Sequence, residues 1–230
     1  MEALDNLFSA TDDFLGSLGT IRKVADSLSS PEALRPSQLP MTNAVCCASV
    51  VLLSGYFENF LKDIVKEFIE KVNSLSKPIS EIPLDMIQKH YAGGSDALAW
   101  AVKLDKKVKS NIYSQDLTAR LGSLGNSSGY TLAWESFANT RSNPSPDIVK
   151  DILQGLEIKK VWPEINDLYK SHGSLNSFLT SFIEMRNECA HTGRNTTPPS
   201  GMDIADYVDK FIALALGIDF LIGHQFEEYS

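Results

Sequence analysis

Apolar residues recur every three or four positions along one long stretch, and this spacing constrains the fold more than any other feature. The stretch runs from about Met41 to Leu75 and ends before Lys77-Pro78. The apolar positions share one helical face: Leu53, Tyr56, Phe57, Phe60, Leu61, Ile64, Val65, Phe68 and Val72. This repeat matches the 3.6-residue turn of an α-helix and not the two-residue repeat of a strand. The pattern predicts one long helix with a buried face.

The remaining segments also read as helices, and no segment alternates as a half-buried strand would. A first helix is predicted from the apolar positions between residues 4 and 21, followed by a proline-punctuated connector. The middle of the chain is less regular. Four further helices are predicted there, at about 83–91, 96–109, 113–121 and 130–141.

Two local patterns mark helix starts later in the chain. Ser145 suits an N-cap, with Pro146 at the first helical position. A short helix is expected after Trp162, and another near residue 174. The latter carries an apolar row: Leu175, Phe178, Phe182, Met185 and Cys189. Ser200 with Asp203 resembles a capping box that opens the final helix.

The fold class that follows is all-α, an antiparallel helical bundle with an inserted helical subregion. With 230 residues, 43% of them hydrophobic, the chain can bury a sizeable core. Residues 1–40 are expected to form the N-terminal helix and connector. Residues 41–230 would form the main domain, with residues 77–172 inserted in it.

Charge and apolar runs restrict the classes of function. The net charge is -8 and the sequence pI is about 5.0, which argues against non-specific coating of nucleic acid but allows a local basic site. The acidic N-terminus lacks a basic signal region, and the apolar run from Ala44 to Phe57 is too short to cross a bilayer. A cytoplasmic protein with no membrane partner is expected, with Cys46, Cys47 and Cys189 as buried reduced thiols.

The segment EMRNECAHTG, residues 184–193, places an arginine, an amide and a histidine together on a helix. Asn187 and His191 are four residues apart and share a face, and Arg186 lies about 100° around from Asn187. All three border the apolar row. The spacing R-x4-H alone carries little weight, whereas Asn directly after Arg makes the set rare by chance, at well under about one in a hundred for this composition.

These groups match what RNA cleavage requires. A histidine with a pKa near 6.5 moves protons at neutral pH, and a guanidinium binds a phosphate that gains negative charge. RNA supplies its own nucleophile, the 2′-hydroxyl, so neither a metal ion nor a covalent enzyme intermediate is needed. A two-fold dimer would bring two histidines to one phosphate. The alternative is a solvated helix end, with Arg186 paired to Glu184 or Glu188.

The stretch RNECAHTG resembles the R-N-x3-H signature of HEPN domains, in particular the RiboL-PSP type. The upstream helix agrees with it, because Phe57, Glu58 and Leu61 match an "FE-x-x-L" pattern. The resemblance covers about residues 41–222. It implies an all-α domain that dimerises through the motif helices. It further implies a metal-independent endoribonuclease, of a kind found among toxins and defence effectors.

Carried over by position, the resemblance assigns phosphate binding to Arg186, positioning to Asn187 and proton transfer to His191. It implies an RNA substrate, a homodimer and a cognate antitoxin or regulatory protein. Two supporting residues are weaker. Glu58 either orients Arg186 or pairs with Lys62 at the rim of the helix. Arg194 adds positive charge beside the motif.

Control by adenylylation is not expected, because Gly193 stands where HEPN toxins silenced in that way carry a tyrosine. A basic run in the middle region either guides RNA or is a solvated helix face: Lys103, Lys106, Lys107 and Lys109.

No other constellation points to chemistry. The remaining histidines have no second ligand at metal spacing, so no metal and no cofactor are predicted. Trp100, Trp134 and Trp162 are expected in or over the core, with base stacking open for one of them. Two further functions stay open. One is a non-catalytic HEPN module that binds a nucleotide, RNA or a partner protein, and the other is an inhibitory partner of another toxin.

Overall fold

The computed structural model describes residues 8–125, 129–140, 144–192 and 197–229, with residues 191 and 192 described by their backbone only. This described part contains eight α-helices, three 3₁₀ turns and no strand, which confirms the all-α prediction. The α-helices are α1 (Ser9–Leu28), α2 (Leu39–Ser74), α3 (Leu84–Val108), α4 (Ile112–Ser123), α5 (Pro146–Gln154), α6 (Val161–Leu168), α7 (Leu175–Thr192) and α8 (Gly201–Tyr229). The 3₁₀ turns are η1 (Ile79–Glu81), η2 (Trp134–Ser136) and η3 (Lys170–His172).

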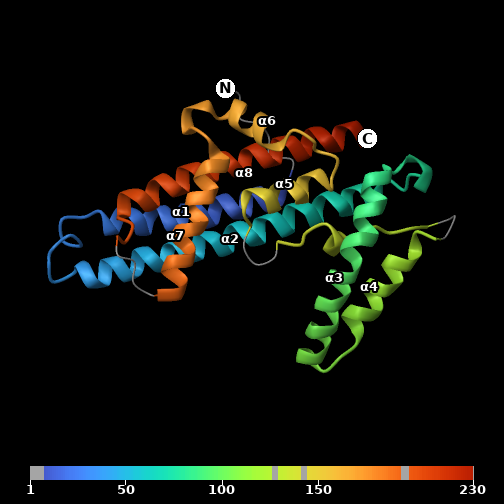
Figure 1. Cartoon of the computed structure of the whole chain (residues 1–230), viewed down its shortest axis with the longest axis horizontal. Coiled ribbons are helices and arrows are strands. Elements are labelled where there is room, and N and C mark those ends of the chain that lie inside the picture. Colours follow the sequence, from blue (N-terminus) through green and yellow to red (C-terminus); the bar gives the residue numbers. More distant parts are fainter. Residues whose placement is uncertain (1–7, 126–128, 141–143, 193–196, 230) are drawn as a thin grey trace.

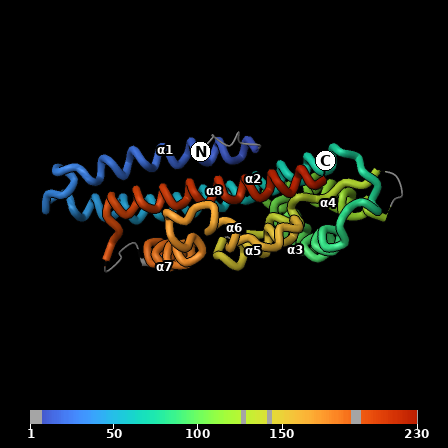
Figure 2. The backbone as a smooth tube through the Cα atoms, turned by 90° about the horizontal axis from the view of Figure 1, so that it is seen from above, coloured from blue at the N-terminus to red at the C-terminus, as the bar shows by residue number. Residues whose placement is uncertain are grey.

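Three long helices form the body of the molecule. Helix α1 packs against both α2 and α8 and runs antiparallel to them (Figure 1). Helices α5, α6 and α7 lie on the side of this body opposite α1 (Figure 2). Helix α7 crosses α2 steeply and contacts it. The end of α7 that carries the arginine–asparagine pair is therefore placed by packing against α2.

An aromatic cluster joins four of these helices. Phe211 of α8 lies 4.7 Å from Phe182 of α7 and 5.1 Å from Phe57 of α2, measured between ring centroids. Phe14 of α1 and Phe178 of α7 contact the same ring edge-on. Edge-to-face pairs of this kind add to the free energy gained by burial. The cluster fixes α7 one turn before Arg186.

Helix α2 is the core helix of the bundle. It is the one helix among the described residues that is long and apolar enough to cross a membrane. Half of its most apolar 18-residue window is buried in the molecule. Its contacts with α1, α7 and α8 account for this apolar character.

Helix α3 is continuous, so the prediction of two helices at 83–91 and 96–109 was wrong. The two adjacent glycines between them lie inside the helix. A Cβ on Gly93 would lie 1.9 Å from the carbonyl oxygen of Ser136, and one on Gly94 would lie 2.6 Å from Cδ2 of Leu121. These glycines do not end the helix. They let η2 and α4 pack directly on it, in a hairpin of α3 and α4 that projects from the bundle (Figure 1).

The helix predicted at 130–141 was also wrong, because its described part holds only the 3₁₀ turn η2. Side chains distant in sequence satisfy the backbone instead. Asn73 accepts from the Leu132 N–H at 2.9 Å and donates to the Leu132 carbonyl at 3.1 Å. Nδ1 of His90 accepts from the Ala133 N–H at 3.1 Å. These tertiary hydrogen bonds hold the segment extended, so it has no need of helical ones.

Both predicted helix starts are confirmed. The Ser145 hydroxyl accepts a hydrogen bond from the Ile148 N–H, and Pro146 occupies the first turn of α5. At the start of α8, the Asp203 carboxylate accepts from the Ser200 N–H at 2.8 Å, and the Ser200 hydroxyl accepts from the Asp203 N–H at 3.2 Å. This reciprocal pair is a capping box.

The burial of His90 predicts that stability depends on pH. The ring is fully buried, and burial, helped by the charge of Arg120, lowers the pKa of His90 to about 4, although Glu135 acts in the opposite direction. The folded-state pKa lies below the unfolded value of about 6.5, so protonation favours the unfolded chain. The contribution of the neutral, buried ring to the free energy of unfolding is complete above about pH 6.5 and is lost as the pH falls toward 4.

We expect this histidine to remove about 2 kcal/mol of unfolding free energy between pH 7 and pH 5, at up to 1.4 kcal/mol per pH unit. Urea unfolding at the two pH values measures the loss. His90→Gln should reduce the difference between the two pH values, whatever its effect on stability at pH 7. An unchanged difference in the variant would assign the pH dependence to other groups.

Candidate functional site on helix α7

Arg186 and Asn187 contact each other on the last turns of α7. Both side chains are half-buried, and Nη1 of Arg186 donates to Oδ1 of Asn187 at 3.1 Å. Nε of Arg186 is buried, and within the described part of the chain it has no hydrogen-bond partner. The sequence placed these residues at the border of the apolar row, and the structure places them there, since Phe182 and Cys189 on that row are buried.

Glu58 reaches the same region from α2. Its side chain is 19% exposed and accepts hydrogen bonds from Nζ of Lys62 at 2.6 Å and from Oγ1 of Thr140 at 2.8 Å. Burial alone would raise the pKa of Glu58. The two hydrogen bonds and the charges of Lys62 and Arg186 outweigh burial and lower it.

The two interpretations of Glu58 are therefore compatible. The ion pair with Lys62 is present, and the carboxylate also lies within electrostatic reach of Arg186. Whether the carboxylate also orients Arg186 stays a prediction, because the hydrogen bond that Arg186 donates goes to Asn187. Thr140 comes from the segment after η2, and no local sequence pattern indicates its contact with a residue 82 positions away.

Three thiols lie beneath the motif. Cys46 and Cys47 of α2 and Cys189 of α7 are all free and buried, as predicted. Burial raises the pKa of Cys189 to about 12, helped by a hydrogen bond with Cys47, and burial raises the pKa of Cys46 to about 11. The thiols of Cys46 and Cys189 stay protonated at neutral pH and are poor nucleophiles. Their contribution is to pack α7 against α2.

Two predicted site residues lie partly or wholly outside the described residues. The backbone of His191 belongs to the last turn of α7, but its side chain is not described. Arg194 lies outside the described ranges. The structure thus brings together Arg186, Asn187 and Glu58 among the predicted set.

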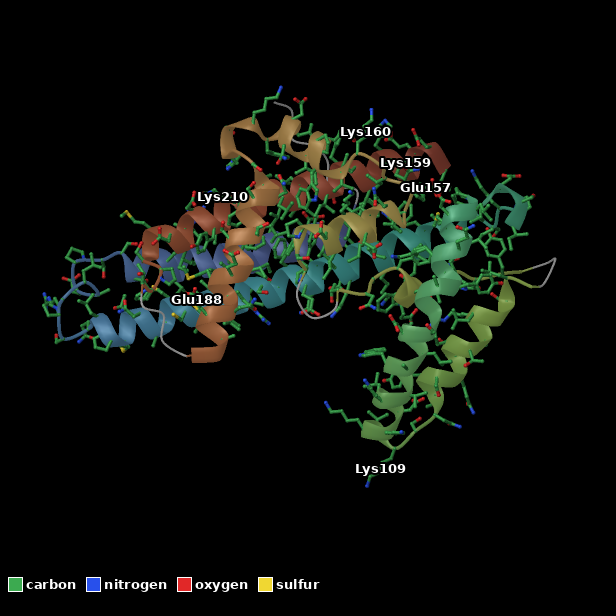
Figure 3. All side chains as sticks on the ribbon, viewed as in Figure 1. Lys109, Glu157, Lys159, Lys160, Glu188 and Lys210 are labelled. Carbon is green, nitrogen blue, oxygen red and sulfur yellow. The ribbon has the colours of Figure 1, made fainter. Side chains whose placement is uncertain are left out.

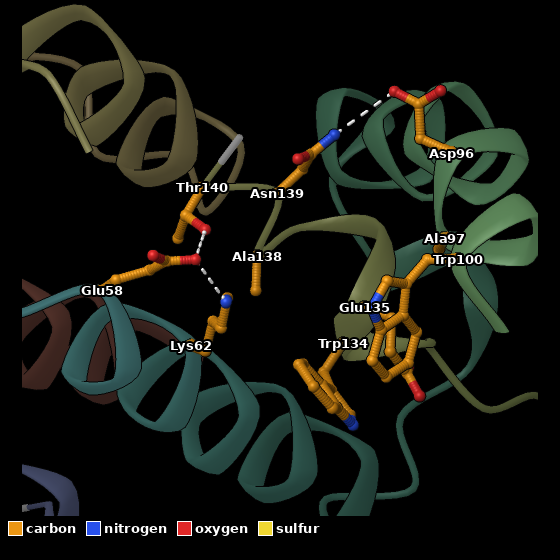
Figure 4. A pocket seen from close by; sticks show the side chains of 10 residues that line it. All are labelled: Glu58, Lys62, Asp96, Ala97, Trp100, Trp134, Glu135, Ala138, Asn139 and Thr140. Atoms are coloured by element: carbon orange, nitrogen blue, oxygen red, sulfur yellow. Dashed lines mark hydrogen bonds and ion pairs between the residues drawn. The ribbon is translucent and has the colours of Figure 1, made fainter. Parts of the chain in front are cut away.

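A pocket opens on the other side of Glu58. It has a volume of about 210 Å³ and lies between α2, α3 and the segment of η2 (Figure 4). Its lining includes six polar or aromatic side chains: Glu58, Lys62, Asp96, Trp100, Trp134 and Asn139. Trp100 is 54% exposed, so its expected place in or over the core was wrong. Trp134 and Trp162 are partly buried against the core, as predicted.

The lysines of the middle region are exposed: Lys103, Lys106 and Lys107 lie on α3, and Lys109 directly follows its last residue. Figure 3 shows Lys109 at the tip of the α3–α4 hairpin and Glu188 near the C-terminal end of α7. A solvated helix face and an RNA-guiding surface both require this exposure. Lys109 and Glu188 lie in different parts of the molecule (Figure 3). The pocket at Trp100 lies between α2 and α3.

Comparison with known protein families gives one match. The model of the RiboL-PSP-HEPN family matches residues 21–223. No match was found among curated proteins or among solved structures. The matched range contains the long helix α2, the whole of α7 and nearly all of α8.

Proposed function

Because the chain belongs to the RiboL-PSP-HEPN family, we propose that it is an endoribonuclease that cuts RNA without a metal ion. Membership of this family, over a range that includes Arg186, Asn187 and His191, is the observation that carries the proposal. The contact between Arg186 and Asn187 supports it, because it presents a guanidinium and an amide together at the surface of the bundle.

The proposed reaction is a transesterification. The 2′-oxygen of the substrate attacks the adjacent phosphorus, and its proton passes to the imidazole of His191. The bond between phosphorus and the 5′-oxygen breaks, and His191 of the partner subunit gives a proton to that oxygen. Arg186 binds the phosphate oxygens, whose negative charge grows in the transition state. The products are a 2′,3′-cyclic phosphate and a 5′-hydroxyl.

Glu58 serves as a positioning residue in this scheme. Its carboxylate is fixed by Lys62 and Thr140 and lies within electrostatic reach of Arg186. A guanidinium attracted toward a fixed carboxylate loses less conformational freedom when it binds phosphate. Asn187 accepts from Arg186 and so restricts the same side chain from its own helix. Arg194 would add positive charge for the incoming RNA.

A homodimer completes the site. Each copy of the motif offers one histidine, whereas the reaction needs a base and an acid. The outward face of α7 is exposed at Glu184, Glu188 and Ala190, so a second copy can approach this end of the helix. A two-fold axis here would place two motifs around one phosphate. In the cell such an enzyme would act as a toxin or defence effector, restrained by a cognate antitoxin or another regulatory protein.

Cleavage in the presence of a chelator tests the proposal. The purified chain is incubated with mixed cellular RNA in EDTA, and the new ends are mapped. We expect 2′,3′-cyclic phosphates and 5′-hydroxyls. Intact RNA, bound or unbound, would overturn the nuclease proposal and leave the chain as a non-catalytic module.

A further inference from the structure

The pocket beside Glu58 has a size and lining suited to one flat aromatic group. Sites for small molecules usually measure about 300–1,000 Å³, so a pocket of about 210 Å³ suits a single base better than a whole cofactor. Trp100 and Trp134 lie on one side of it, and Lys62 and the Asp96–Asn139 pair lie at its other edges (Figure 4). Nδ2 of Asn139 donates to Oδ2 of Asp96 at 3.3 Å.

Trp100 provides the stacking surface. More than half of this side chain is exposed, whereas Trp134 is half-buried and has Nζ of Lys66 5.9 Å from its ring centroid. An exposed indole beside a pocket offers a flat face on which any base can stack. The Asp96 carboxylate has a second oxygen that can accept from the amino group of a base. A base stacked within a duplex has no free face for the indole, so an unpaired base is the one that can stack on Trp100 in the pocket.

The pocket shares a wall with the proposed catalytic site. Glu58 and Thr140 line the pocket, and Glu58 also lies within electrostatic reach of Arg186. A nucleotide whose base enters the pocket would therefore lie beside Glu58, the pocket carboxylate within electrostatic reach of Arg186.

Helix α3 continues this surface away from the pocket. Asp96, Trp100, Lys103 and Lys107 are separated by four, three and four residues, so they share one helical face. All four are exposed or line the pocket. Lys106 lies about 100° around the helix from Lys107 and so outside this row. Lys109 follows the last residue of α3 in a left-handed backbone conformation and does not continue the row. Two of the four lysines thus lie in line with the pocket.

We propose that single-stranded RNA lies along this face of α3, with one unpaired base stacked on Trp100 in the pocket and the following phosphates on Lys103 and Lys107. The inference rests on the proposed function, because it identifies the substrate as an unpaired segment beside the scissile phosphate. A local basic row on a chain with net charge -8 confines RNA to one path. Aromatic stacking combined with a basic track is how proteins bind single strands without reading a sequence.

Binding of an RNA that cannot be cut tests this path. The probe is a fluorescein-labelled 2′-O-methyl oligonucleotide, which lacks the free 2′-hydroxyl that the proposed reaction needs. Fluorescence anisotropy gives its affinity at several salt concentrations. We expect Trp100→Ala to weaken binding about tenfold and Trp100→Phe to retain most of the affinity. The matched control is Tyr91→Ala, because Tyr91 is equally exposed on α3 but does not line the pocket.

The lysine row is tested against lysines of the same helix. Lys103→Gln with Lys107→Gln should lower the slope of log K against log salt concentration by about 1.4, since each phosphate contact on a single strand contributes about 0.7. Lys106→Gln with Lys109→Gln removes the same charge and should leave the slope within about 0.3 of its original value. A duplex of the same sequence should bind more weakly than the single strand.

Several results would overturn the path. The path is excluded if Trp100→Ala and Tyr91→Ala lose equal affinity for the oligonucleotide, or if the two lysine pairs give equal slopes of log K against log salt concentration. It is also excluded if the duplex or an acidic peptide binds more strongly than the single-stranded oligonucleotide. The proposed nuclease function fails separately. If wild-type protein binds the oligonucleotide as expected but leaves natural RNA intact, the RNA path is supported and the nuclease function is excluded. If the protein cuts RNA while all variants bind the oligonucleotide equally, the nuclease function is supported and the RNA path is excluded.

Discussion

Replacing His191 by alanine is expected to slow RNA cleavage in EDTA by about 10²–10⁴-fold, the range that one general acid or base contributes. Arg186→Ala should slow it by about 10²–10³-fold, because the charge that develops on the phosphate loses its donor. Arg186→Lys should recover only part of this loss, since an ammonium group cannot bind two oxygens in the same plane. The measurement is the single-turnover rate on a defined RNA.

The control for the first prediction is His224→Ala. His224 is 63% exposed on α8, away from the motif, and its removal should leave the rate within about twofold. The double variant of Arg186 and His191 should cost less than the product of the two single losses, because residues that act as one unit are not additive. Equal rates for wild type, His191→Ala and His224→Ala would exclude the assigned roles.

Gly93→Ala is expected to lower the free energy of unfolding by about 2–3 kcal/mol. The added Cβ would lie 1.9 Å from the backbone oxygen of Ser136, and a backbone atom cannot turn aside as a side chain can. Either α3 or η2 must shift, and the wall of the pocket at Trp134 shifts with them. Urea unfolding followed by circular dichroism measures the change.

Gly122→Ala is the matched control for this substitution. Gly122 is exposed in the other helix of the hairpin, and a Cβ there would have nothing within 4 Å. Because alanine favours a helix over glycine, stability should stay constant or rise by up to about 1 kcal/mol. Equal destabilisation by both substitutions would show that the contact with Ser136 does not decide the outcome.

The sequence predicted those parts of the fold that depend on neighbours in the chain. The periodic apolar face of α2, the Ser145 cap and the Ser200–Asp203 capping box all act over a few residues, and all are confirmed. The segment around η2 could not be predicted in this way. Its backbone is held by Asn73 and His90, which lie more than forty residues earlier in the chain.

Gly93 of α3 also shows that local sequence patterns do not reveal long-range packing. Gly93 inside a helical pattern reads as a break, because its advantage appears only when Ser136 packs against it. Long-range packing of this kind overrides local propensity. Nothing near α3 in the sequence indicates which segment will lie on it.

For the candidate site, the sequence supplied Arg186, Asn187 and the Glu58–Lys62 pair, and the structure brings them into one region. It did not supply Thr140, whose contact with Glu58 joins distant segments. The row through Trp100 was available, since its residues lie at helical spacing within one predicted helix. The sequence does not show which face of α3 borders the pocket, because the other walls come from α2 and the segment of η2.

The proposed mechanism requires two copies of the motif to act on one phosphodiester. Wild type and His191→Ala are mixed in equal amounts at constant total concentration, allowed to exchange subunits, and assayed for RNA cleavage in EDTA. If both histidines serve one site, only wild-type homodimers cut at full rate, and the activity should fall to about one quarter of the unmixed wild type. An activity of about one half would mean that each subunit works alone and would contradict the shared site.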